Sequence, residues 1–159
     1  MSDTPIFPRT VVGGLSLPRL VIGTNWFLGY SHTSLAKDKF IKDYQTQDRI
    51  SAVLAAFLEL GVDAVMGPLS TYLDEAVRAA EQRTGRALIR LYTPAFEINP
   101  AAEALSNAAR AFDECAAMGA AFCLPHQCVT DALVDRRAGV IRDLVTGLPA
   151  SGSAAGGRR

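Results

Sequence analysis

Apolar residues along the chain follow two patterns, a helical spacing and short continuous runs of strand length. In three places a helix-like stretch ends at a glycine, an apolar run follows, and that run stops at or near a proline. These places are residues 61–68, 85–94 and 119–125, and residues 20–24 form a fourth apolar run. The alternation of four buried strands with helices predicts parallel β/α units.

The helices expected between these strands each carry one apolar face. Capping residues and terminal glycines place them at residues 46–61, 70–85 and 99–119, and a further helix is expected from Thr130. Their apolar faces are Ile50, Val53, Leu54, Phe57 and Leu58 in the first, Leu73, Ala76, Val77 and Ala80 in the second, and Ala104, Leu105, Ala108, Phe112 and Cys115 in the third.

Other segments depart from this repeat. Short apolar stretches on either side of a Gly-Gly pair predict a hairpin over residues 10–17. Residues 25–45 form a long irregular stretch in which a short helix is expected. Residues 1–9 are expected to be a flexible lead-in. Residues 147–159 are small and have nothing to bury, so they are expected to form a disordered tail after a domain of residues 10–146.

A hairpin followed by four β/α units predicts an α/β fold, the N-terminal half of a TIM-type barrel. A whole barrel typically has about 250 residues, whereas the chain has 159. A complete open sheet of flavodoxin type is the alternative at this length. The hairpin, and the lack of a G-x-G-x-x-G turn after residues 20–24, favour the half-barrel. In both folds the chemistry lies at the carboxyl ends of the strands.

The charge and hydropathy of the chain argue against two classes of partner. Lys plus Arg equals 16 and Asp plus Glu equals 16, so the formal net charge is zero and no nucleic-acid partner is expected. No apolar run approaches the roughly 20 residues that span a bilayer, so no membrane partner is expected. The N-terminus lacks a secretory leader, and the three cysteines fit buried thiols in a reducing compartment, so we expect a cytoplasmic protein.

Residues 13–24 read Gly-Gly-Leu-Ser-Leu-Pro-Arg-Leu-Val-Ile-Gly-Thr, and they resemble the opening hairpin and first strand of the aldo/keto reductases. Residues 58–62 are similar to the end of that family's first helix. The resemblance covers residues 10–127 and implies the barrel fold.

The catalytic tetrad of that family consists of Asp, Tyr, Lys and His. In this chain the resemblance places Met66 where the family has Asp, and Tyr92 or Thr93 where it has Lys. The position of the family's Tyr falls near Thr71, and Tyr72 is one residue away from it. Only the His is matched, by His126. Because the tyrosine acid of a reductase is tuned by the neighbouring Lys and Asp, the resemblance supports the fold and argues against carbonyl reduction.

The candidate site residues follow the predicted strands. His126, after the fourth strand, is the catalytic candidate for proton transfer, and its alternative role is a hydrogen bond to a backbone carbonyl. Asn25 and Trp26, after the first strand, are candidates for substrate binding, since an amide orients a ligand and an indole walls a pocket. The alternative for Trp26 is a place in the core.

Arg90 and Tyr92 complete the substrate-binding candidates. Strand alternation places both on one face with Leu88, and the guanidinium of Arg90 suits an anionic substrate. The structural alternative is an ion pair between Arg90 and Asp63 on the neighbouring strand, or between Arg90 and a carboxylate on the missing half of the barrel.

These patterns predict the first half of an enzyme that acts on a small polar or anionic metabolite, and we expect little or no catalytic activity from this chain alone. One alternative is a non-catalytic half-barrel that assembles with itself or a partner through its open sheet edges. Another is a flavodoxin-like domain that binds a nucleotide or flavin. The sequence identifies no cofactor. No metal is expected, because the spacing of Cys123, His126 and Cys128 is not that of a zinc site.

Overall fold

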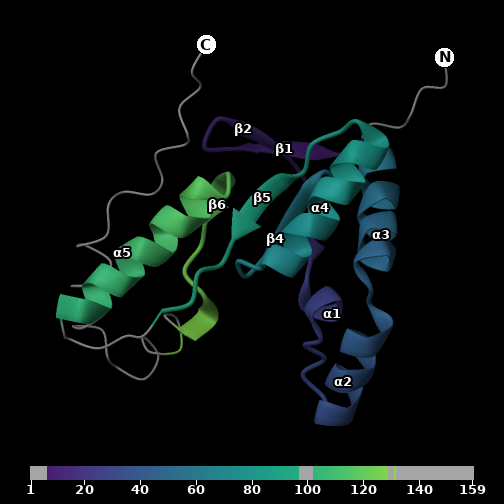
Figure 1. Cartoon of the computed structure of the whole chain (residues 1–159). Helices are drawn as coiled ribbons and strands as arrows, with labels where there is room; N and C mark the ends of the chain where they lie inside the picture. The colour runs from purple at the N-terminus through teal and green to yellow at the C-terminus, as the bar shows by residue number, and fades with distance from the viewer. Residues whose placement is uncertain (1–6, 97–101, 129–130, 132–159) are drawn as a thin grey trace. The chain divides into compact units, whose positions relative to one another are not determined.

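The computed structural model describes residues 7–96, 102–128 and 131 (Figure 1). The fold is mixed α/β, as predicted. Among the described residues, four parallel strands lie in the order β3-β4-β5-β6, and β1 and β2 form a separate antiparallel hairpin. The chain divides into two compact units, residues 1–89 and 90–159.

The first unit contains the hairpin, two strands of the parallel sheet and four helices. The strands are β1 (Arg9–Val12), β2 (Leu15–Pro18), β3 (Ile22–Gly23) and β4 (Ala64–Gly67), and the helices are α1 (Asn25–Leu28), α2 (Leu35–Tyr44), α3 (Gln47–Glu59) and α4 (Thr71–Thr84). The second unit follows with β5 (Ile89–Tyr92), which begins at the boundary, α5 (Ala102–Ala117) and β6 (Ala120–Cys123).

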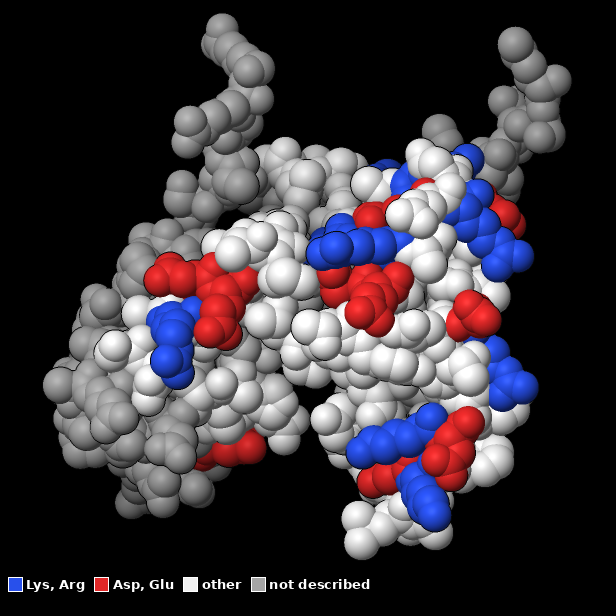
Figure 2. Space-filling view, viewed as in Figure 1, with Lys and Arg blue, Asp and Glu red and all other residues white. Residues whose placement is uncertain are grey.

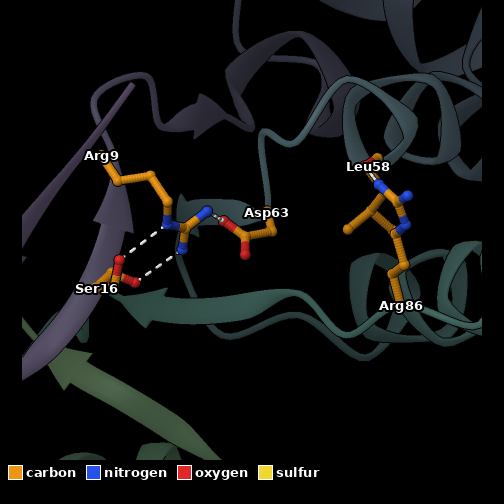
Figure 3. Close-up of polar contacts among 5 residues, drawn as sticks. All are labelled: Arg9, Ser16, Leu58, Asp63 and Arg86. Atoms are coloured by element: carbon orange, nitrogen blue, oxygen red, sulfur yellow. Dashed lines mark hydrogen bonds and ion pairs between the residues drawn. The ribbon is translucent and has the colours of Figure 1, made fainter. Parts of the chain in front are cut away.

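The hairpin is confirmed, and one arginine fixes it to the rest of the first unit. Arg9 donates from Nη1 to Asp63 Oδ1 at 2.9 Å, and its other nitrogens donate to the hydroxyl and the carbonyl of Ser16 at 2.9 and 2.8 Å (Figure 3). Another arginine, Arg86, donates to the carbonyl of Leu58 at 2.7 Å, which adds a second hydrogen bond to a carbonyl at the end of α3 that also accepts the N–H of Gly61 (Figure 3).

The core of the first unit lies between β3 and β4 and the helices α3 and α4. The predicted apolar face of α4 is fully buried, and so are Ile50, Leu54 and Leu58 of α3. Val53, which was expected on the same face of α3, is 39% exposed. The buried face of α3 includes Ser51 and Ala55 instead, and α3 packs on α4.

The strand expected at residues 20–24 is shorter than predicted. Leu20 is 45% exposed, and only Ile22 and Gly23 pair with β4. The reason is the junction with the hairpin, where the backbone N–H of Arg19 donates to the carbonyl of Pro8 at 2.8 Å. This bond ends the hairpin, and Leu20 lies in the bend before β3.

Residues 25–45, expected to be irregular with one short helix, form two helices that pack on each other. Gly29 ends α1 with a left-handed φ of 81°, a conformation that glycine adopts without steric cost. Ser34 caps α2 by accepting the N–H of Lys37 at 3.3 Å. Only Ile41 of α2 is buried, so the apolar spacing of this helix is too weak to reveal it.

In the second unit, β5 and β6 pair in parallel, with a register shift between Arg90 and Leu91. Helix α5 packs beside β6 and buries Ala108, Phe112 and Cys115, as predicted. The predicted helix start at residues 99–100, the predicted helix from residue 130 and the predicted tail at 147–159 lie outside the described residues.

Candidate functional site

The carboxyl ends of β3 and β4 are locked together in register. Gly23 pairs with Met66, and the buried hydroxyl of Thr24 donates to the carbonyl of Met66 at 3.2 Å. A Cβ atom added at Gly67 would stand 2.0 Å from Thr24 Oγ1. This contact gives the residues that follow β3 a fixed starting point.

Asn25 and His32 form a polar pair directly after that end of β3. The Asn25 amide nitrogen lies 2.9 Å from His32 Nε2. An amide N–H that donates there makes Nε2 the acceptor and leaves the imidazole proton on Nδ1. His32 has a φ of 56°, and it is the one non-glycine among the described residues with a positive φ. Such backbone conformations are concentrated at functional sites.

The loop that carries His32 is fixed by one carboxylate. Asp38, in the first turn of α2, accepts the backbone N–H of Ser31 at 2.7 Å and its hydroxyl at 2.5 Å. These hydrogen bonds lower the pKa of Asp38, and the nearby charges of Lys42 and His32 act in the same direction. The carboxylate therefore holds the loop in place while it is ionised.

Trp26 and Lys37 form a second part of the site. The indole of Trp26 is 54% exposed, and the Lys37 ammonium lies 4.9 Å from the ring centroid. A place for Trp26 in the core, the alternative raised by the sequence, is wrong, because the neighbouring Phe27 fills the buried position of α1. The pair presents a flat ring and a cation to solvent.

The first unit thus brings Asn25 and Trp26, both predicted, close to residues that the sequence did not single out for the site. Neither His32 nor Lys37 directly follows a predicted strand, so the position of the strands gives no signal for them. Figure 2 shows basic and acidic side chains intermingled over α2. Chemically, the arrangement offers an amide, an imidazole, an ammonium and an indole to a small polar or anionic ligand.

The second unit holds the other three predicted residues. The backbone N–H of His126 donates to Pro94 O at 3.0 Å, and its Nδ1 accepts from the N–H of Cys128 at 3.5 Å, a long contact. Tyr92 is buried, and Arg90 is half-buried beside the register shift, where strict strand alternation does not hold. Asp63, suggested as the partner of Arg90, is bonded by Arg9.

Cys115 and Cys123 of the second unit lie next to each other away from bulk solvent. Burial raises the pKa of Cys115 to about 12, helped by the adjacent Cys123, whose own pKa is also raised by burial. Across the described part of the chain, no three His, Cys, Asp or Glu side chains gather in a way that could hold a metal ion.

The whole chain was compared with protein-family models, with curated proteins and with solved structures, and none of them matches. Within the described residues, every helix is too short or too polar to cross a membrane. The assignment of the site therefore rests on its own residues.

Proposed function

We propose that the first unit binds a small polar or anionic metabolite at the carboxyl end of β3, as the opening part of a β/α-barrel enzyme related to the aldo/keto reductases. The observation that carries the proposal is the Asn25–His32 hydrogen bond beside the exposed Trp26–Lys37 pair. Ligands of parallel β/α folds bind at this end of the strands.

Each side chain has a distinct role in this proposal. The Lys37 ammonium, which has no carboxylate partner among the described residues, is the counter-ion for a carboxylate or phosphate group. His32 offers its Nδ1–H as a donor while Asn25 fixes the ring through Nε2. Trp26 is the wall against which the uncharged part of the ligand packs.

The barrel part of the proposal has support from topology. The four described parallel strands follow one another in chain order, whereas a flavodoxin-type sheet reverses its order at a switch point. A hairpin precedes the first of these strands, as the resemblance to the reductases implies. In the second unit, His126 stays the predicted group for proton transfer, with Nε2 as the ring nitrogen for which no hydrogen bond is described.

A thermal-shift screen of the full chain against small carboxylates and phosphates tests the proposal. A ligand present at 100 times its Kd stabilises the folded state by about 2.7 kcal/mol. We expect Lys37→Gln and His32→Ala to abolish that shift without changing the Tm of the free protein, because both side chains are exposed. Lys39→Gln is the matched control on the same helix, and it should keep the full shift.

Two outcomes would refute the proposed site. One is a screen in which no anionic compound stabilises the chain. The other is a hit whose stabilisation is the same in Lys37→Gln and Lys39→Gln, since binding would then take place away from the Trp26–Lys37 pair.

Self-assembly is a second candidate function, favoured by the exposure of β6. This strand is the last in the described sheet order, all four of its residues are partly exposed, and Leu124 after it is 45% exposed. Edge strands with unpaired backbone groups recruit further strands. Light scattering of the purified chain decides this candidate, because a monomer at all concentrations excludes it.

A further inference from the structure

Exposed aromatic rings and cations lie along α2, on the neighbouring α1 and at the start of α3. We call this surface the α2 strip, and it consists of Trp26, Lys37, Phe40, Tyr44 and Arg49. The rings of Trp26, Phe40 and Tyr44 are 54%, 62% and 51% exposed. Large apolar side chains at this exposure contribute little to the core, so their clustering calls for another explanation.

The α2 strip contains two stacked groups, Trp26 with Lys37 and Phe40 with Tyr44 and Arg49. Phe40 and Tyr44 have ring centroids 5.7 Å apart and planes 19° from parallel. The Arg49 guanidinium lies 4.0 Å over the Tyr44 ring, and Nη1 also donates to the Tyr44 carbonyl at 2.6 Å. Lys37, Phe40 and Tyr44 are three and four residues apart, so they share one face of α2.

The two cations of the α2 strip lack carboxylate partners. In the described ranges, neither Lys37 nor Arg49 forms an ion pair, and each lies over an aromatic ring instead. Successive residues of an α-helix are about 100° apart around its axis. The acidic residues of α2, Asp38 and Asp43, therefore lie about 100° or more around the helix from Tyr44. Asp38 is moreover engaged by Ser31. The strip therefore combines apolar surface with uncompensated positive charge.

We propose that the α2 strip is a docking surface for an acidic segment of another protein. Carboxylates of the partner pair with Lys37 and Arg49, and its apolar side chains cover Phe40 and Tyr44. A second copy of this chain is disfavoured, because a two-fold contact would bring the same cations together. Nucleic acid is disfavoured by the zero net charge of the chain and by the carboxylates on the rest of α2. The α2 strip shares Trp26 and Lys37 with the proposed metabolite site, whereas Phe40, Tyr44 and Arg49 belong to the strip alone, so variants of these three residues test it separately.

Calorimetric titration of the full chain with a synthetic peptide of repeated Glu-Leu-Pro triplets tests this surface. The fluorescence of Trp26, the only tryptophan in the sequence, provides a second readout. We expect the peptide to bind, and added salt to weaken the binding. Arg49→Gln and Phe40→Ala should each reduce affinity about fivefold. Arg83→Gln, an exposed arginine on α4, is the matched control and should leave affinity unchanged.

Several results would overturn the proposal. If a peptide with Gln in place of every Glu binds equally well, the carboxylates of the Glu peptide do not pair with Lys37 and Arg49. If the Glu peptide does not bind, an acidic protein segment is excluded as the partner. If an oligothymidine strand binds in its place, the partner is a nucleic acid. A concentration-dependent dimer in light scattering that Phe40→Ala dissolves would assign the strip to a second copy.

Discussion

Replacement of Gly67 by alanine is the sharpest test of how the strand ends are fixed. The added Cβ would stand 2.0 Å from Oγ1, 3.0 Å from Cβ and 3.1 Å from Cγ2 of Thr24. The first distance is far below van der Waals contact. Thr24 is only 2% exposed, so its side chain has no open direction in which to move.

The magnitude follows from two alternative responses of the site. Overpacking of a close-packed site costs about 1–3 kcal/mol. If Thr24 rotates away instead, its hydroxyl loses the 3.2 Å bond to Met66 O, and burying that hydroxyl without a partner costs about 1–3 kcal/mol. Either response costs about the same, so we expect Gly67→Ala to lower the free energy of unfolding by about 1–3 kcal/mol.

Urea unfolding followed by circular dichroism measures this loss. Gly23→Ala is the matched control, because a Cβ there meets no atom within 4 Å, and its effect should stay within about 0.5 kcal/mol. In a Thr24→Ala background the 2.0 Å contact disappears, so Gly67→Ala should cost clearly less than in the native chain. Equal losses in both backgrounds, or equal stability of the Gly67 and Gly23 variants, would refute the reasoning.

Three further predictions concern charge and burial. The carboxyl of Asp38 should titrate below 3.8 in an NMR pH series, and a midpoint at or above 3.8 contradicts this. Because the folded pKa is lowered, the stability that the ionised carboxylate adds is fully present above 3.8 and should be lost as the pH falls through the folded pKa. Arg9→Met should cost about 1–2 kcal/mol in urea unfolding, against an unchanged Arg19→Met control, because the bonds to Asp63 and Ser16 are lost. Cys115 should resist iodoacetamide until the chain unfolds, and labelling of Cys115 in the native protein would count against its burial. Because the folded pKa of this thiol is raised to about 12, the stability linked to its protonation should decline as the pH rises above 9.0.

The order of strands and helices was predictable because it depends on local periodicity. Glycines such as Gly61 and Gly85 adopt the left-handed φ that ends or follows a helix, so they mark boundaries that the sequence shows directly. Finer details depend on tertiary contacts. The face of α3 that is buried depends on its packing with α4 and includes Ser51 and Ala55, whereas hydrophobicity alone favours Val53.

The candidate site was predictable only in part. Asn25 was found because it follows a strand, but its partner His32 is brought back by a left-handed turn, and a histidine in such a turn carries no sequence signal. A signal for α2 was present in Ser34, a good capping residue. The environment of Arg90 could not be inferred from alternation, since the register shift beside it depends on the pairing with β6.

The bond between Arg9 and Asp63 also has a temporal consequence. The two residues are separated by 54 positions, and a ribosome adds about 5–20 residues per second. About 3–11 seconds therefore pass between synthesis of the guanidinium and synthesis of its carboxylate. During that interval the nascent hairpin has no anchor, so the emerging chain depends on later residues to retain its first folded element.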